Sequence, residues 1–193
     1  MISVPSSEAE VTVEEGFGPS DSQLMEETAR GDREAFASLI GRHQRLVLSI
    51  AARYLGDRDE AEDAAQEVFI RLWHGARRYQ PSSALEAYLR TLTVNLCLDM
   101  RRKRRFVVLS GEDDRTGSDD PQGEAQMAER RNALDRALQN LPSSQRMAVV
   151  LFHMEGLNMG EVARLMETSP KAVESLLSRA RAALRENLAG LLR

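Results

Sequence analysis

Two sharp helix breaks between residues 143 and 184 constrain the fold more than any other feature of this sequence. The first break is Gly156-Leu157-Asn158, where the glycine can end one helix and the Asn158 side chain can cap the next. The second break ends at Ser169-Pro170, and a proline at the first position of a helix loses nothing by lacking an N–H. Three short helices separated by two such breaks are typical of a helix-turn-helix.

The helix expected from Pro170 has one apolar and one polar face. The apolar face repeats at spacings of three and four and consists of Val173, Leu176, Leu177, Ala180 and Leu184. The polar face carries Lys171, Glu174, Ser175, Ser178, Arg179, Arg181 and Arg185. Such a face can contact base edges from its first turns and phosphates through its arginines, which favours duplex DNA as the ligand. An ordinary three-helix bundle with a solvated charged face is the alternative.

The composition favours an all-α protein. The 193 residues are 42% hydrophobic, which is enough for a folded core, but only 5% are aromatic. Low glycine and proline content, with abundant Ala, Leu, Arg and Glu, argues against a β-sandwich or barrel. The net charge of −4 is an average over unevenly charged segments, so it does not exclude a nucleic-acid ligand.

Cysteine and histidine usage argues against a disulfide framework and a metal centre. Cys97 is the one cysteine, and the three histidines lie far apart in the sequence, so we expect no metal and no cofactor. Cys97 lies in an apolar run, where a buried, unreactive thiol is expected. The N-terminus lacks a signal-peptide pattern and no apolar stretch approaches the length of a membrane span, so we expect a cytoplasmic protein without membrane insertion.

The first half of the chain predicts three helices behind a disordered acidic leader at residues 1–20. Gly31-Asp32 separates a short helix from a longer one that ends at Leu55-Gly56, and Asp57 opens the third. The early acidic run of this third helix suits the helix dipole; it comprises Asp59, Glu60, Glu62 and Asp63. The alternative is a surface for a protein partner made of Asp63, Gln66, Glu67, Ile70 and Arg71. The pattern alone favours the dipole.

A fourth helix, capped by Ser83, ends in five consecutive basic residues at 101–105. Complementing the helix dipole takes fewer cations than this, and five adjacent cations repel one another unless an anion is near. The run therefore predicts phosphate binding. Asn95, Asp99 and Arg102 can share one helical face, from which polar side chains could meet bases while arginines hold the backbone.

The stretch 107–124 is acidic and rich in Gly and Ser, which predicts a flexible linker that could also occupy a groove meant for nucleic acid. Helical spacing resumes near residue 125. We therefore expect two small helical domains, at 21–106 and 125–193, on either side of this linker.

Three segments in this order resemble bacterial RNA polymerase sigma factors of the extracytoplasmic-function (ECF) group: DEAEDAAQEVFIRLW, NLCLDMRRKRR and LPSSQRMAVVLFHMEGLNMGEVARLMETSPKAVESLLSRARAALRE. They are similar to the family's polymerase-binding helix, promoter-melting helix and C-terminal helix-turn-helix. The resemblance covers about residues 21–190. It implies that 21–106 is sigma domain two, that 125–193 is sigma domain four, and that the linker threads toward the RNA channel of the polymerase.

The resemblance also implies partners. The first is core RNA polymerase, bound through its β′ clamp helices and its β flap. The second is promoter DNA, single-stranded downstream and duplex upstream. The third is an anti-sigma protein. The implied polymerase-binding residues are Asp63, Gln66, Glu67, Ile70 and Arg71. The resemblance thus favours a partner-binding surface over the helix-dipole explanation of this segment. Phe69, Leu72 and Trp73 would be largely core. Residues implied to contact downstream DNA are Asn95, Asp99, Arg101, Arg102, Arg104 and Arg105, with a flipped base near the turn at 79–83. Those implied to contact upstream DNA are Lys171, Glu174, Ser175, Ser178, Arg179 and Arg181.

Some positions depart from the family pattern. Leu85 and Tyr88 stand where the family commonly carries Phe and Trp, which alters the aromatic packing beneath the base pocket. Glu167 replaces a residue that is frequently Gly, which predicts a different turn conformation or mild strain. At Asn158-Met159 the family often has Ser or Thr followed by an aromatic residue.

Two other functions compete with this interpretation. One is a helix-turn-helix regulator that acts without being a polymerase subunit, although such a regulator does not need the second basic helix. The other is a metal-dependent nuclease built on Asp59, Glu60, Glu62 and Asp63, but these carboxylates crowd one helix and have no converging partner site. We therefore expect no enzymatic activity.

Overall fold

The computed structural model describes residues 18–79, 84–110 and 133–189, and all regular elements within these ranges are helical, as the composition predicted. In chain order the elements are α1 (Asp21–Ala29), α2 (Arg33–Leu55), α3 (Arg58–Gly75), the 3₁₀ turn η1 (Ala76–Arg78), α4 (Leu85–Ser110), a helical segment at residues 133–139, α6 (Ser143–Val149), the π-helical turn η2 (Val150–Met154), α7 (Met159–Leu165) and α8 (Pro170–Leu188). None of the described helices combines the length and apolarity needed to cross a bilayer.

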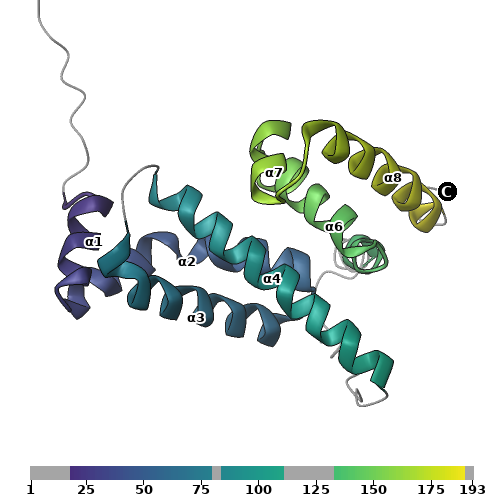
Figure 1. Ribbon diagram of the computed structural model, residues 1–193. Helices are drawn as coiled ribbons and strands as arrows, with labels where there is room; N and C mark the ends of the chain where they lie inside the picture. The colour runs from purple at the N-terminus through teal and green to yellow at the C-terminus, as the bar shows by residue number, and fades with distance from the viewer. Residues whose placement is uncertain (1–17, 80–83, 111–132, 190–193) are drawn as a thin grey trace, which may run out of the picture.

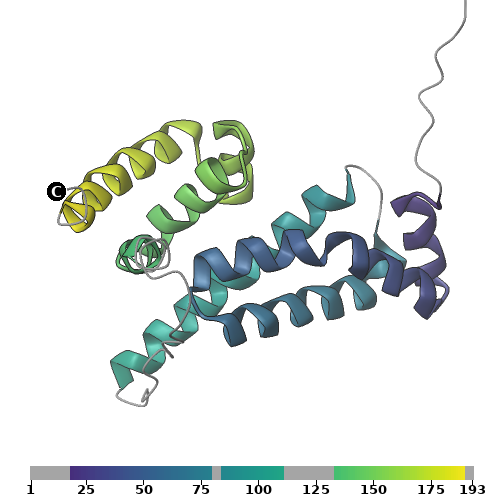
Figure 2. The ribbon, with the colours of Figure 1, turned by 180° about the vertical axis from the view of Figure 1, so that it is seen from behind.

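Helices α1 to α4 form an N-terminal bundle with α2 at its centre. Helix α2 packs against α1, α3 and α4, and Figure 1 shows α2, α3 and α4 side by side with α1 at one end. Leu39, Val47 and Ile50 on α2 are fully buried, and each such burial stabilises the fold by about 1.5–3 kcal/mol. The C-terminal end of α4 projects beyond α3 in both views (Figure 1 and Figure 2).

The predicted boundary between α2 and α3 is confirmed by its caps. Gly56 adopts φ 75 at the end of α2, a left-handed conformation that favours glycine. The Asp57 carboxylate then accepts from the backbone N–H of Glu60 at 2.9 Å and starts α3. Helix α4 runs to Ser110, past the change of charge at residue 106, because Val107, Val108 and Leu109 contain no helix breaker.

The C-terminal bundle, from residue 133 to 189, contains the expected helix-turn-helix. The Asn158 side chain accepts from the N–H groups of Gly160 and Glu161, and the Glu161 carboxylate accepts from the Asn158 N–H in return. Ser169 caps α8 with Pro170 at its first position, as predicted. Val173 and Leu177 on the apolar face of α8 are buried against the preceding helices.

The two bundles pack directly on each other. Helix α4 contacts α6 and α7, and α2 contacts η2, so the C-terminal bundle lies against α2 and α4 (Figure 1 and Figure 2). The predicted start of the linker at residue 107 is wrong, because residues 107–110 belong to α4. The rest of the predicted linker, most of the leader and the proposed cap at Ser83 lie outside the described residues, at 111–132, 1–17 and 80–83 respectively.

Candidate functional site

The outer face of α3 presents the residues expected to bind polymerase. Asp63, Gln66 and Arg71 are exposed, and Glu67 accepts from Arg71 Nε at 2.7 Å. Ile70 lies among them with 50% of its surface exposed, the highest exposure of the large apolar side chains in the described ranges that face solvent. An apolar side chain ringed by polar groups is the usual pattern of a protein-binding patch. The structure therefore brings all five residues to one accessible surface.

The opposite face of α3 belongs to the core. Phe69 and Leu72 are buried, and Trp73 packs on Phe36 with ring centroids 4.9 Å apart. These aromatic contacts fix the rotation of α3 about its own axis. They therefore hold Ile70 on the solvent side.

The basic end of α4 divides into an outward and an inward set. Arg102 has 82% of its side chain exposed and donates to Asp99 at 2.9 Å, on the same face as the exposed Asn95, and Lys103 is also exposed. Arg101 instead donates to the Leu55 carbonyl at 2.7 Å, and Arg104 donates to Glu60 at 2.8 Å. Consecutive helical residues lie about 100° apart, so one run of cations cannot face one ligand. The side chain of Arg105 lies outside the described part of the chain.

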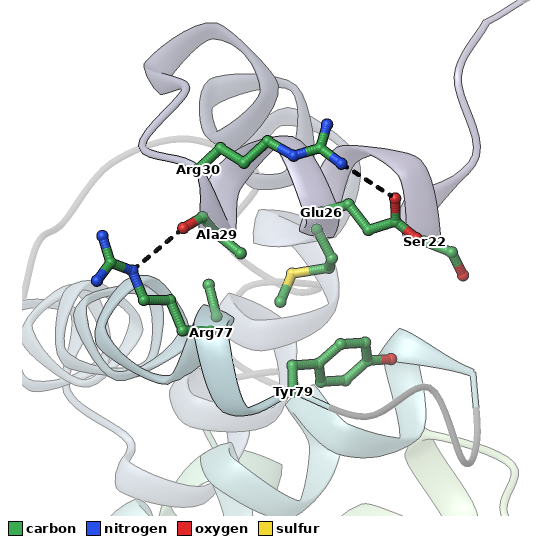
Figure 3. Close-up of a pocket in the computed structure, with 8 residues that line it drawn as sticks. Ser22, Glu26, Ala29, Arg30, Arg77 and Tyr79 are labelled. Carbon is green, nitrogen blue, oxygen red and sulfur yellow. Dashed lines mark hydrogen bonds and ion pairs between the residues drawn. The ribbon is translucent and has the colours of Figure 1, made fainter.

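Tyr79 borders two hollows at the end of η1. One, of about 390 Å³, lies between α1 and η1. In Figure 3, Arg77 donates to the Ala29 carbonyl at one edge of this hollow, and Tyr79 lies across the hollow from α1. The other, of about 560 Å³, is lined by Ile70, His74, Arg78, Tyr79 and Tyr88, among others. The Tyr79 and Tyr88 rings meet edge to face with centroids 5.4 Å apart, a surface on which a base could stack. Residues 80–83 of the expected base pocket are outside the described residues.

Leu85 and Tyr88, the two residues that depart from the family pattern near this hollow, differ in their burial. Leu85 is 4% exposed and belongs to the core, whereas Tyr88 is half-buried and supplies an aromatic edge to the hollow. Tyr88 therefore lines this hollow directly, whereas Leu85 contacts it only through the core.

The polar face of α8 is accessible over its whole length. Lys171, Glu174, Ser178 and Arg179 are exposed, and Arg179 donates to the hydroxyl of the half-buried Ser175 at 2.8 Å. Arg181 is exposed but lines a separate apolar groove of about 180 Å³ together with Val149, His153, Leu177, Leu184, Arg185 and Leu188. Five of the six expected upstream-DNA residues thus share one face, and Arg181 lies toward its edge.

The turn before α8 carries the strain that its sequence predicted. Glu167 adopts φ 50, the left-handed conformation, which costs a residue with a side chain about 1–2 kcal/mol. The turn geometry that a glycine would favour is therefore retained by Glu167.

A buried arginine between the two bundles was not predicted. Arg146 is 4% exposed and donates to the carbonyls of Leu138, Gln139 and Leu141 in its own bundle and to the Tyr54 carbonyl, at 2.9 Å, in the other. Burial, followed by the charge of Arg101, lowers the pKa of Arg146 to about 10, so the guanidinium stays protonated at neutral pH. A sequence signal existed, because Arg146 lies three and four residues before the buried Val149 and Val150 and so on the core stripe.

Glu155 makes a second unpredicted contact between the bundles. Its side chain is 8% exposed and accepts from the Ser49 hydroxyl at 2.8 Å, from Arg53 at 2.6 Å and from Arg90 at 3.3 Å. All three donors belong to α2 and α4. No local pattern marks Glu155, because it follows η2 as one acidic residue before a glycine.

The remaining reactive groups have structural surroundings. Cys97 is buried, as predicted, and burial raises the pKa of its thiol to about 12. Glu60 and Glu62 of the suggested nuclease set are paired with Arg104 and Arg58. Within the described ranges, no cluster of three or more His, Cys, Asp or Glu residues could hold a metal.

Comparison with known proteins gives consistent matches over most of the chain. The family described as Sigma-70 region 2 matches residues 39–107, and the family described as Sigma-70, region 4 matches residues 131–184. The ECF RNA polymerase sigma factor SigE of Mycolicibacterium smegmatis is 35% identical over 185 residues, covering 92% of this chain and 71% of that protein. The ECF RNA polymerase sigma factor SigM of Mycobacterium tuberculosis is 33% identical over 179 residues, covering 88% of this chain and 87% of that protein.

Solved structures share the fold. CnrH in complex with the cytosolic domain of CnrY aligns with a TM-score of 0.63 and 27% identity, covering 88% of this chain and 97% of that one. The sigma factor RpoE from Bartonella quintana, solved with the anti-sigma factor NepR, aligns with a TM-score of 0.67 and 23% identity over 81% of this chain and 98% of that one.

Proposed function

This chain belongs to the ECF group of RNA polymerase sigma factors, and we propose that its two bundles hold promoter DNA at separate points while core polymerase carries both. The observation that carries the proposal is the order of the two family matches, residues 39–107 and 131–184, on one chain. The N-terminal bundle, with its expected start at residue 21, serves as sigma domain two. The C-terminal bundle, with an expected domain start at residue 125, serves as sigma domain four.

Polymerase docking falls to the α3 face and to the groove on α6 and α8. The exposed Ile70, framed by Asp63, Gln66, Glu67 and Arg71, suits a contact with the β′ clamp helices. The groove beside Arg181 is lined mainly by apolar side chains of α6 and α8, which suits the β flap. Both surfaces are accessible before any partner binds.

DNA recognition is divided between α4 and α8. The Asn95, Asp99 and Arg102 face, with Tyr79 and Tyr88 beside it in the same bundle, has the hydrogen-bonding groups and aromatic rings that unpaired bases need. The polar face of α8 has the mixture of hydroxyl, acidic and basic side chains that reads a duplex. The protein on this proposal has no catalytic chemistry of its own and works in the cytoplasm beside the polymerase.

An anti-sigma protein fits a groove between the bundles. The groove has a volume of about 580 Å³ and takes Ala87, Arg90 and Thr91 from α4, and Leu157 and Leu165 from the C-terminal bundle. The complex of CnrH with the cytosolic domain of CnrY is the precedent for a protein ligand on this fold. A protein in this groove would contact both bundles at once.

The proposal is tested by run-off transcription with core polymerase on genomic fragments, followed by mapping of start sites. We expect specific transcripts only when the protein and core polymerase are both present. Specific DNA binding by the protein alone, with no co-purification with core polymerase, would instead support a helix-turn-helix regulator.

Substitution of Arg102→Gln together with Lys103→Gln should make downstream binding less dependent on salt. If each cation neutralises one phosphate of a single strand, the slope of log affinity against log salt concentration becomes shallower by about 1.4. The affinity of the reconstituted holoenzyme for a single-stranded downstream oligonucleotide, measured at several salt concentrations, gives this slope. Arg45→Gln, an exposed cation on α2, is the control, and an unchanged slope in the double variant would contradict the phosphate role.

A further inference from the structure

Two arginines near the end of α4 bind the corner where α2 ends and α3 begins. Arg101 donates to the Leu55 carbonyl at 2.7 Å, at the C-terminal end of α2, where helix carbonyls lack acceptable donors within the helix. Arg104 donates to the Glu60 carboxylate at 2.8 Å, in the first turn of α3. Because they are three residues apart, the two side chains lie on the same side of α4. They attach the basic end of α4 to both of the helices that meet at this corner.

The face of α4 proposed to bind DNA points away from this corner. Successive helical residues are about 100° apart, which places this face nearly opposite the side of Arg101 and Arg104. The face consists of Asn95, Asp99 and Arg102. The Arg102 side chain is 82% exposed, whereas that of Arg104 is 34% exposed and directed at α3. A strand lying on the exposed face is therefore out of reach of Arg104.

The apolar packing of α4 weakens before the helix ends. Cys97 is fully buried and Met100 is partly buried, but the helix continues to Ser110 and projects beyond α3 (Figure 1 and Figure 2). Arg101 and Arg104 continue the attachment past Met100 with hydrogen bonds. Apolar contacts are non-directional, whereas a charged hydrogen bond has a preferred geometry, so these two contacts can fix the rotation of the helix end.

Glu60 is well placed to serve as the fixed partner. Its backbone N–H donates to the Asp57 carboxylate at 2.9 Å, and an acidic side chain in the first turn suits the dipole of α3. Its side chain is 25% exposed, so salt screens its pair with Arg104 less than it screens a surface pair. The neighbouring pair of Arg58 and Glu62 lies in solvent, with side chains 89% and 50% exposed. The two acids of the same helix therefore differ in what they can hold.

We propose that Glu60 and Arg104 are positioning residues for the downstream strand, because their ion pair fixes the orientation of the α4 face that contacts unpaired bases. The proposal rests on the proposed function of this face in binding DNA. Helix α3 also carries the proposed polymerase-docking face, so the pair sets the direction of the DNA-binding face relative to the polymerase. Without the pair, the end of α4 has the productive orientation for only part of the time, and the apparent affinity for DNA falls by that fraction.

Glu60→Gln gives the sharpest test, because the two roles open to Arg104 predict opposite results. If Arg104 binds phosphate, loss of the Glu60 charge releases the cation and affinity for DNA rises. If Arg104 positions α4, affinity falls, and we expect a loss of about three- to tenfold. Binding of a single-stranded downstream oligonucleotide by the reconstituted holoenzyme, followed by anisotropy, measures the change. Glu62→Gln is the matched control, since it removes the same charge from an exposed pair on the same helix, and it should cause no loss. Unchanged or stronger binding by Glu60→Gln would overturn the proposal.

The salt dependence separates positioning from phosphate contact a second time. Arg104→Gln should weaken binding by about the same factor as Glu60→Gln and leave the slope of log affinity against log salt concentration unchanged. Arg102→Gln should make that slope shallower by about 0.7. The double variant of Glu60→Gln and Arg104→Gln should lose no more affinity than either single variant, because both changes break one contact. A slope reduced by about 0.7 in Arg104→Gln would assign Arg104 to a phosphate and contradict the positioning role.

The orientation of α4 can also be measured directly in the full-length protein without DNA. Spin labels are attached at Asp59→Cys on α3 and Lys103→Cys on α4, both exposed positions, while the buried Cys97 stays unlabelled. We expect a broader distribution of label distances in Glu60→Gln than in Glu62→Gln, and equal distributions would show that the pair does not fix the helix end. If the wild-type holoenzyme fails to bind the oligonucleotide, the DNA-binding role proposed for α4 is wrong, and the label distances still decide whether Glu60 holds α4 in place.

Discussion

Replacing Arg146 with alanine is expected to lower the free energy of unfolding of the C-terminal bundle by about 3–5 kcal/mol. The substitution removes the hydrogen-bond donor of three carbonyls in the same bundle, those of Leu138, Gln139 and Leu141. It also leaves a cavity where the guanidinium lay. Urea unfolding followed by far-ultraviolet circular dichroism measures the loss. The one tryptophan, Trp73, lies in the N-terminal bundle, so its fluorescence follows that bundle separately.

Two further variants divide this loss into its causes. Arg146→Met fills most of the volume but donates no hydrogen bond, so we expect it to remain at least about 2 kcal/mol less stable than the wild type. Arg136→Ala, an exposed arginine in the helical segment 133–139, should stay within about 0.5 kcal/mol. A wild-type-like Arg146→Met would show that the carbonyl contacts contribute little to stability.

The sequence predicted those parts of the fold that depend on near neighbours. Gly56, Asn158 and Pro170 act on the few residues beside them, so a cap or a break can be recognised without knowing the rest of the fold. The same holds for the burial of Val173 and Leu177, which follows from spacing within one helix.

The contacts between the two bundles could not be predicted, because the residues that meet are far apart in the sequence. Arg146 meets a carbonyl 92 residues away, and Glu155 meets a hydroxyl 106 residues away. Nothing in either local pattern indicates such a partner. The run at 101–105 is different, because the charge pattern predicts phosphate binding for the whole run, whereas helical geometry already places Arg101 and Arg102 on different sides of the helix.

If core polymerase docks on α3, a change at the single surface residue Ile70 should strongly weaken polymerase binding. Apolar side chains at the centre of an interface commonly dominate its binding energy, whereas surrounding polar residues contribute less each. Ile70 is half exposed, so an acidic replacement should leave the fold intact and place a charge where the partner requires an apolar contact. We expect Ile70→Glu to weaken binding to core polymerase at least about 30-fold, equivalent to about 2 kcal/mol.

Titration of a fluorescently labelled protein with core polymerase, followed by anisotropy, measures this change. Leu134→Glu is the matched control, because Leu134 is 39% exposed and lies in the C-terminal bundle away from α3. Since Ile70 also lines the hollow beside Tyr79, binding of a single-stranded oligonucleotide by the free variant distinguishes a polymerase contact from a DNA contact. Unchanged oligonucleotide binding with lost polymerase binding supports docking through α3, and equal losses in Ile70→Glu and Leu134→Glu would contradict it.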